Sequence, residues 1–272
     1  MRLKIVHETL YRYATPATRA VEILKLTPRG HDGQFVPFWR IEIDHDCRLV
    51  QATDPFGNVM HSFAAEGPLE GLAITAIGEV EIQDTGGILR GQSERLPPGI
   101  FLRDTSLTTA DAAIRDFALA TAEGADDRIG ILHALMHGIH DRLRFEVNAT
   151  DTGTSAIQAF SLGHGVCQDF AHIFIAAARY LGIPARYVSG YLFRPENTGQ
   201  AAGHAWAEAL VEDLGWVGFD PANAVCPTET HVRLAIGLDY LGAAPVRGTR
   251  YGGSGEELEV RVLVAPAGHG PR

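Results

Sequence analysis

The period of the hydrophobic pattern changes part-way along this chain, and the change limits the folds open to it. Early segments alternate or are rich in β-forming residues, which predicts strands at His7–Tyr13, Phe38–Ile43 and Leu72–Ile82. From Asp84 to Pro98 the sequence is polar and rich in glycine and proline, and afterwards apolar residues recur at helical spacing. The sequence therefore predicts an α+β protein, with a β-rich N-terminal domain at residues 1–90 and a second domain at residues 91–272.

Three helices are expected before the middle of the second domain. Thr108 is a candidate N-cap for the first, with Asp111 three residues later. The second has a single apolar stripe made of Leu132, Leu135, Met136, Ile139 and Leu143. The third is short, because a capping box begins at Ser155 and Gly163 is available to end it.

The clearest helix follows Cys167. Its apolar face consists of Phe170, Ile173, Phe174, Ala177 and Leu181, and Gly182 and Pro184 supply the stop. Strands are then expected at Ala185–Phe193, His204–Val211 and Trp216–Asp220, with one more at Leu258–Val264. Cys167 therefore lies at the N-terminus of a helix that precedes a group of strands.

Composition narrows the classes of function. The formal net charge of -10 argues against a surface that neutralises phosphates, so we expect no nucleic-acid partner. The first residues lack the apolar core of a signal peptide, and no apolar run is long enough to span a membrane. Three widely spaced cysteines do not suggest a disulfide framework or a zinc site. We therefore expect a cytoplasmic protein without a membrane partner, cofactor or metal.

Cys167 is the strongest candidate nucleophile. A cysteine reacts as the thiolate, which the amides and positive end of a helix N-terminus favour. The residues before it, Gly163-His164-Gly165-Val166, allow backbone to approach a substrate closely. The N–H of Cys167 is itself a candidate donor to an oxyanion, whereas the sequence identifies no second donor.

His204 and Asp220 are the candidates for the base and for the acid that orients it. These roles require both side chains on one face of the sheet. A four-residue loop between their strands would place them on opposite faces. A three-residue loop that pairs Val211 with Gly215, or a bulge at Gly215 or Gly218, restores the shared face. The sequence therefore predicts the odd register.

Four ordered segments resemble the bacterial transglutaminase-like proteins. They are Gly165–His172 (GVCQDFAH), Gly182–Tyr191 (GIPARYVSGY), His204–Trp206 (HAW) and Gly215–Pro221 (GWVGFDP). The early motifs His7-x-Thr9-x-Tyr11-x-Tyr13, Leu26-x-Pro28 and Asp54-Pro55-Phe56-Gly57-Asn58 resemble the β-rich region that precedes such domains. The resemblance implies a papain-like core in which a helix bearing Cys167 packs on an antiparallel sheet bearing His204 and Asp220.

The resemblance leaves the reaction open, because related proteins include cross-linking transglutaminases, peptidases and amidases. We favour a hydrolase that cleaves peptide or other amide bonds through a thioester, with a peptide or protein substrate. One alternative is an amine acyltransferase with the same three residues. Another is a non-catalytic peptide-binding module, against which the retention of all three residues speaks. The oligomeric state stays open.

Other candidate residues have simpler explanations. His133, His137 and His140 share a helix face that only flanks the apolar stripe, so a solvated or boundary face is expected. His164 and His172 are expected in packing or at the substrate, and Asp169 at the positive helix end. Trp206 shares a strand face with His204 and is expected in the core or as a shield for the Cys–His pair. Cys47 and Cys226 are expected to be structural thiols.

Overall fold

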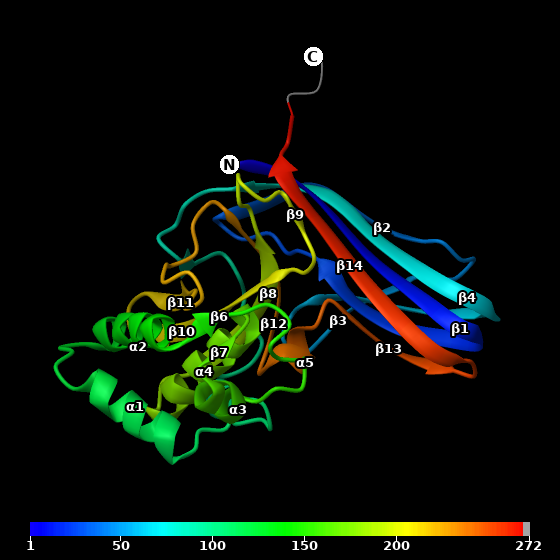
Figure 1. The fold of residues 1–272 in the computed structure, drawn as a ribbon. Coiled ribbons are helices and arrows are strands. Elements are labelled where there is room, and N and C mark those ends of the chain that lie inside the picture. The colour runs from blue at the N-terminus through cyan, green and yellow to red at the C-terminus, as the bar shows by residue number, and fades with distance from the viewer. Residues whose placement is uncertain (269–272) are drawn as a thin grey trace.

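The computed structural model describes residues 1–268 and contains two main sheets (Figure 1). The strands are β1 (Arg2–Thr27), β2 (Gln34–Ile43), β3 (Val50–Thr53), β4 (Val59–Ile82), β5 (Ile88–Leu89), β6 (Arg144–Phe145), β7 (His164–Gly165), β8 (Ala185–Leu192), β9 (Gly199–Gln200), β10 (His204–Val211), β11 (Gly215–Phe219), β12 (His231–Gly237), β13 (Val246–Tyr251) and β14 (Ser254–Pro266). The helices are η1 (Pro98–Leu102, a 3-10 helix), α1 (Ala112–Ala122), α2 (Arg128–Arg142), α3 (Ala156–Leu162), α4 (Cys167–Tyr180) and α5 (Tyr240–Ala243). The α+β class is thus confirmed.

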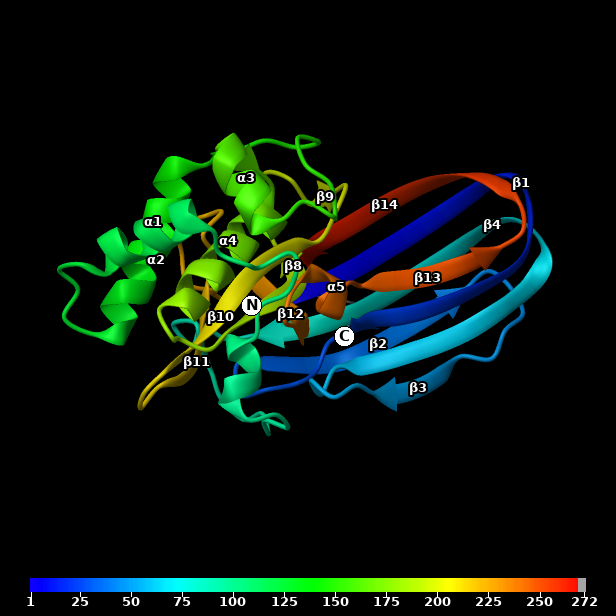
Figure 2. The same ribbon diagram turned by 90° about the horizontal axis from the view of Figure 1, so that it is seen from below.

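The N-terminal sheet is built on two long strands, β1 and β4, which pair antiparallel along most of their length. Figures 1 and 2 show them, with β14, as long curved strands that run away from the helices. Both β13 and β14 pair with β1, so the C-terminal strands belong to the same sheet as the N-terminal one. The domain boundary between residues 90 and 91 stays a prediction. Strands β13 and β14, within residues 246–266, come after that boundary in the sequence but belong to the first sheet.

The second sheet has the strand order β12-β8-β10-β11-β5 and supports the site. Helix α4 packs on one face of it, where Ala205, Ala207 and Ala209 of β10 are buried in the same core cluster as Phe174. Small side chains allow the helix to approach closely, as the alternation of β10 predicts. The opposite face carries His204, Trp206 and Glu208.

Most predicted elements are confirmed, but one helix cap is wrong. Helix α1 begins after Asp111, whose Oδ1 accepts from the N–H of Ile114 at 3.0 Å. Thr108 is not the cap because its hydroxyl is engaged elsewhere, accepting from Nη1 of Arg179 at 2.7 Å. The capping box at Ser155 and the left-handed Gly163 that follows α3 are both present, as predicted.

Two side-chain amides of the N-terminal region cover the outer edge of β12. The amide of Gln34 donates to the carbonyl of Arg233 (2.9 Å) and accepts from its N–H (2.8 Å). The amide of Asn58 makes the same pair of bonds with Ile236, each at 2.8 Å. Arg233 and Ile236 are three residues apart, and a register shift between Arg233 and Ala235 lets both face this edge of β12. The amides therefore replace a neighbouring strand and join the two sheets.

Asn58→Asp removes the donor of one of these amides while keeping its shape. The new carboxylate cannot donate to the carbonyl of Ile236, and it lies beside Asp54, whose Oδ2 now accepts from Asn58 at 2.8 Å. We expect a loss of about 2–4 kcal/mol in the free energy of unfolding, measured with urea. The control Asn197→Asp makes the same chemical change at an exposed residue. Equal urea midpoints for the two variants would refute the role of the amide.

Candidate active site

Cys167 is the first residue of α4, and the loop before it is held in place by Asp169. The Oδ2 atom of Asp169 accepts from the N–H of Val166 at 2.8 Å and from the hydroxyl of Thr150 at 2.6 Å. A Cβ atom at Gly165 would lie 2.5 Å from that oxygen, so glycine is required there. Burial raises the pKa of Asp169, and the two hydrogen bonds oppose that rise. The loop therefore presents Cys167 in a fixed position.

The predicted odd register between β10 and β11 is confirmed. Val211 pairs with Gly215 across a three-residue loop, in which Asp213 has a φ of 66°. Gly215 itself has a φ of 84°, a conformation that favours glycine. As a result Asp220, just after β11, reaches the face that carries His204, and its Oδ2 lies 2.6 Å from Nε2 of His204.

The buried carboxylate of Asp220 is the centre of a hydrogen-bond cluster. Its Oδ2 also accepts from Nδ2 of Asn223 at 2.6 Å and lies 3.2 Å from Nε2 of His231. Its Oδ1 accepts from the backbone N–H groups of Ala222 (3.1 Å) and Asn223 (3.3 Å). Burial would raise the pKa of Asp220, but the charge and hydrogen bond of His204 and the hydrogen bond of His231 hold it well below its ordinary value.

His204 interacts with both this carboxylate and the thiol. Burial lowers the pKa of His204, but the charges of Asp220 and Cys167, with the hydrogen bond to Asp220, outweigh burial and raise it to about 10. Since Nε2 faces Asp220, the other ring nitrogen, Nδ1, is left for Cys167. At neutral pH the raised pKa of His204 keeps this buried ring an imidazolium.

Among residues 1–268, one group of three side chains has metal-ligand atoms within 4.8 Å of one another: His204, Asp220 and His231. Nδ1 of His231 accepts from the N–H of Thr228 at 3.2 Å, so a neutral ring carries its proton on Nε2. Histidines that bind metals have the opposite arrangement, in which the second nitrogen donates. The donor set thus fits a hydrogen-bonded cluster and does not fit a metal site.

Two family models match segments of this chain. The model of the transglutaminase-like superfamily matches residues 115–221, and that of the bacterial transglutaminase-like N-terminal region matches residues 3–81. The uncharacterized protein ML0607 of Mycobacterium leprae is 30% identical over 97% of this chain and 98% of its own length. The chain belongs to the transglutaminase-like superfamily. Uncharacterized protein Rv2569c of Mycobacterium tuberculosis is 27% identical over 97% of this chain and 93% of its own.

A solved structure resembles this transglutaminase-like protein along its whole length. The "Putative Cysteine Protease" from Cytophaga hutchinsonii has a TM-score of 0.79 and 20% identity, and the match covers 100% of this chain and 92% of that one. The likeness shows the papain-like core with its strand-rich N-terminal region. Together with the family, it supports a general cysteine-dependent enzyme.

The other candidates of this transglutaminase-like protein lie in packing positions. Trp206 is buried on the face of His204 and meets the ring of His231 edge-on, with centroids 5.5 Å apart. His172 is buried, and its Nε2 accepts from the N–H of Tyr240 at 3.0 Å. His133 packs edge-on against Phe219.

Cys47, Cys167 and Cys226 are all unpaired. No helix among residues 1–268 is long and apolar enough to cross a membrane.

The sequence prediction missed His231 and Asn223. Asn223 lies three residues after Asp220, where a turn brings side chain and backbone back onto the carboxylate. His231 is the first residue of β12, and the sequence does show a histidine at the start of a mostly apolar segment. That signal alone does not say which neighbouring strand the histidine faces.

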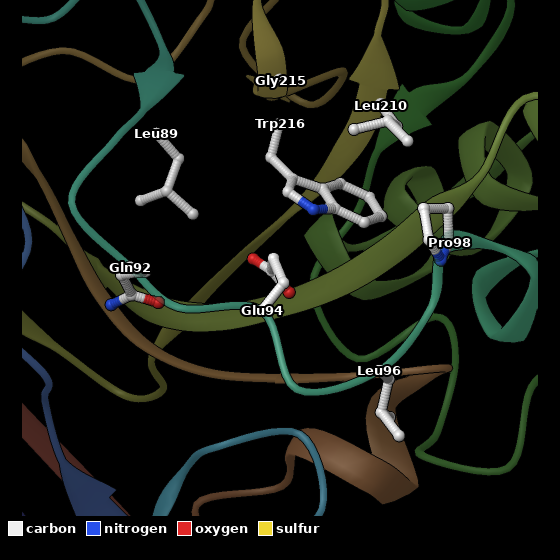
Figure 3. A pocket seen from close by; sticks show the side chains of 8 residues that line it. All are labelled: Leu89, Gln92, Glu94, Leu96, Pro98, Leu210, Gly215 and Trp216. Atoms are coloured by element: carbon white, nitrogen blue, oxygen red, sulfur yellow. The ribbon is translucent and has the colours of Figure 1, made fainter.

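A cavity of about 300 Å³ lies at the other end of β11, and the residues that line it do not include the candidate triad. Figure 3 shows Leu89, Glu94 and Trp216 around this space. Glu94 forms an ion pair with the buried Arg186 at 2.9 Å, and that guanidinium stacks over Trp216. Two lining residues of the cavity, Glu94 and Trp216, are therefore held by contacts with the buried Arg186.

Asp220→Asn removes the charge that keeps His204 protonated. We expect the pKa of His204 to fall from about 10 by about 1–3 units, because burial then opposes the imidazolium with less compensation. NMR titration of ¹⁵N-labelled imidazoles measures the change. Asp239→Asn, a buried carboxylate that caps α5, is the control and leaves the pKa of His204 in place. An unaltered titration in Asp220→Asn would exclude the charge pairing.

Proposed function

We propose that this protein is a cysteine-nucleophile hydrolase that cleaves peptide or other amide bonds through Cys167, His204 and Asp220. One observation carries the proposal: the buried His204 lies 2.6 Å from Asp220, and the pKa of its ring responds to the charge of Cys167. Thiol, imidazole and carboxylate in this order form the chain of contacts that activates a nucleophile.

In the proposed reaction the Cys167 thiolate attacks the amide carbonyl. The N–H of Cys167 supports the developing oxyanion, since the first N–H groups of a helix have no partner within it. The His204 imidazolium then gives its proton to the departing amine, which leaves a thioester and a neutral imidazole. That imidazole takes a proton from water as the water attacks, the acid product leaves, and the thiolate–imidazolium pair returns.

Peptide or protein amides are the proposed substrates, and the proposed location is the cytoplasm. The three unpaired cysteines fit a reducing compartment, where a thiol stays available as a nucleophile. The cysteine protease name of the Cytophaga hutchinsonii neighbour is consistent with an amide substrate.

Alkylation of Cys167 by iodoacetamide tests the activated pair without a substrate. In a Cys47→Ser, Cys226→Ser background, we expect a rate that is already high at pH 6 and nearly flat until His204 loses its proton near pH 10. In His204→Ala the rate should instead rise only near the ordinary thiol pKa of about 8.5. Mass spectrometry of the labelled peptide gives both profiles, and two identical profiles would count against the pair.

Turnover of a peptide library in H₂¹⁸O tests hydrolysis against acyl transfer. We expect one ¹⁸O atom in each new carboxyl group, with no preference for an added primary amine as acceptor. Cys167→Ser should reduce turnover by about 10³-fold or more, because an alkoxide does not form on a serine in this place. Products that carry the amine and no ¹⁸O would show an acyltransferase instead.

A further inference from the structure

Asp220 faces two imidazoles, of which the proposed mechanism uses only one. Oδ2 lies 2.6 Å from Nε2 of His204 and 3.2 Å from Nε2 of His231. His231 is buried, with 6% of its surface exposed, and its ring centroid lies 6.0 Å from that of His204. Two histidines therefore converge on one carboxylate oxygen from two different strands, β10 and β12.

The two rings differ in charge, and the contacts of His231 show why. Its Nδ1 accepts from the backbone N–H of Thr228 at 3.2 Å, and the hydroxyl of Thr230 lies at the same distance. The proton of the neutral ring is thus on Nε2, directed at Asp220. Burial lowers the pKa of His231, and the charges of His204 and Arg194 lower it further. The hydrogen bond and charge of Asp220 raise it, but only partly offset this lowering. His231 is therefore a neutral donor beside the His204 imidazolium.

We propose that His231 is a positioning residue, whose neutral Nε2–H holds the carboxylate of Asp220 against His204; this inference rests on the proposed function. The carboxylate is fixed on both sides. Backbone N–H groups of residues 222 and 223 hold Oδ1, while His231 and Asn223 hold Oδ2 at the distance that suits His204. Trp206, packed edge-on against His231, covers the same face.

The N-terminal domain supplies the support for this second imidazole. His231 begins β12, and the amides of Gln34 and Asn58 fix the outer edge of that strand at Arg233 and Ile236. The first of these anchors is two residues from His231. The N-terminal domain thus affects Asp220 and His204 indirectly, through the position of β12. The two amides themselves contact β12 and not Cys167.

Two substitutions at residue 231 separate positioning from packing. His231→Phe keeps a ring of similar width but has no donor, whereas His231→Gln keeps an N–H group that reaches toward Asp220. We expect His231→Phe to lower the pKa of His204 by about one unit, a tenfold change in the equilibrium, and His231→Gln to restore most of it. NMR titration of the His204 ring gives the pKa, and the alkaline end of the Cys167 alkylation profile should move with it.

The outcomes are distinct from those of the proposed function. An unchanged His204 pKa in a folded His231→Phe variant would overturn the positioning role and leave the hydrolase proposal standing. An unreactive wild-type Cys167 would overturn the hydrolase proposal, while the His204 titration would still report on His231. The wild-type protein offers a test that needs no variant: ¹⁵N shifts should show His231 protonated on Nε2 alone, and a proton on Nδ1 would refute the proposal.

Discussion

The burial of one charged carboxylate, that of Asp220, constrains how the strands of the second sheet are arranged. A carboxylate removed from water is costly unless hydrogen bonds and an opposite charge replace its hydration. The replacement comes from β10 through His204, from β12 through His231 and from the turn after β11. These three segments must therefore keep their relative positions, so the register of the sheet and the geometry of the site are a single requirement.

A second buried charge cluster lies on the same face of the sheet. Glu208 binds Arg186 and Arg233, each at 2.6 Å, and burial would raise its pKa, but the two guanidiniums lower it to about 2. The alternation of β10 places Glu208 four residues from His204 on one face, while its alanines serve α4 on the other. One side of the strand is thus reserved for helix packing and the other for charge. The charged side fixes which strands are neighbours, because a displaced strand would leave an arginine buried without its partner.

Local patterns in the sequence were enough to predict the parts of the site that depend on neighbouring residues. The start of α4 at Cys167 follows from helix signals, and the shared face of His204 and Asp220 follows from the parity of a short loop. The cap of α1 was misplaced by three residues because Thr108 and Asp111 are both good caps, and a distant contact of Thr108 with Arg179 decided between them. Such a contact leaves no local signal.

Contacts between distant segments explain what else escaped prediction. The pairing of Gln34 and Asn58 with β12 joins residues about two hundred positions apart, and a bulge in β12 changes which backbone groups face outward. His231 depends on that same strand. Strand periodicity predicts which residues share a face, but it does not identify the strand or the side chain that lies beside them.

The return of β13 and β14 to the first strand has a consequence for the order in which the protein is made. β1 is synthesised more than two hundred residues before its partners β13 and β14. During synthesis one edge of this long strand therefore stays without its partners, and such edges invite pairing with other chains. The segment with Cys167 emerges well before the N-terminal sheet is closed. A chain whose synthesis stops before residue 246 would thus contain Cys167 but lack both of the strands that complete this edge of the first sheet.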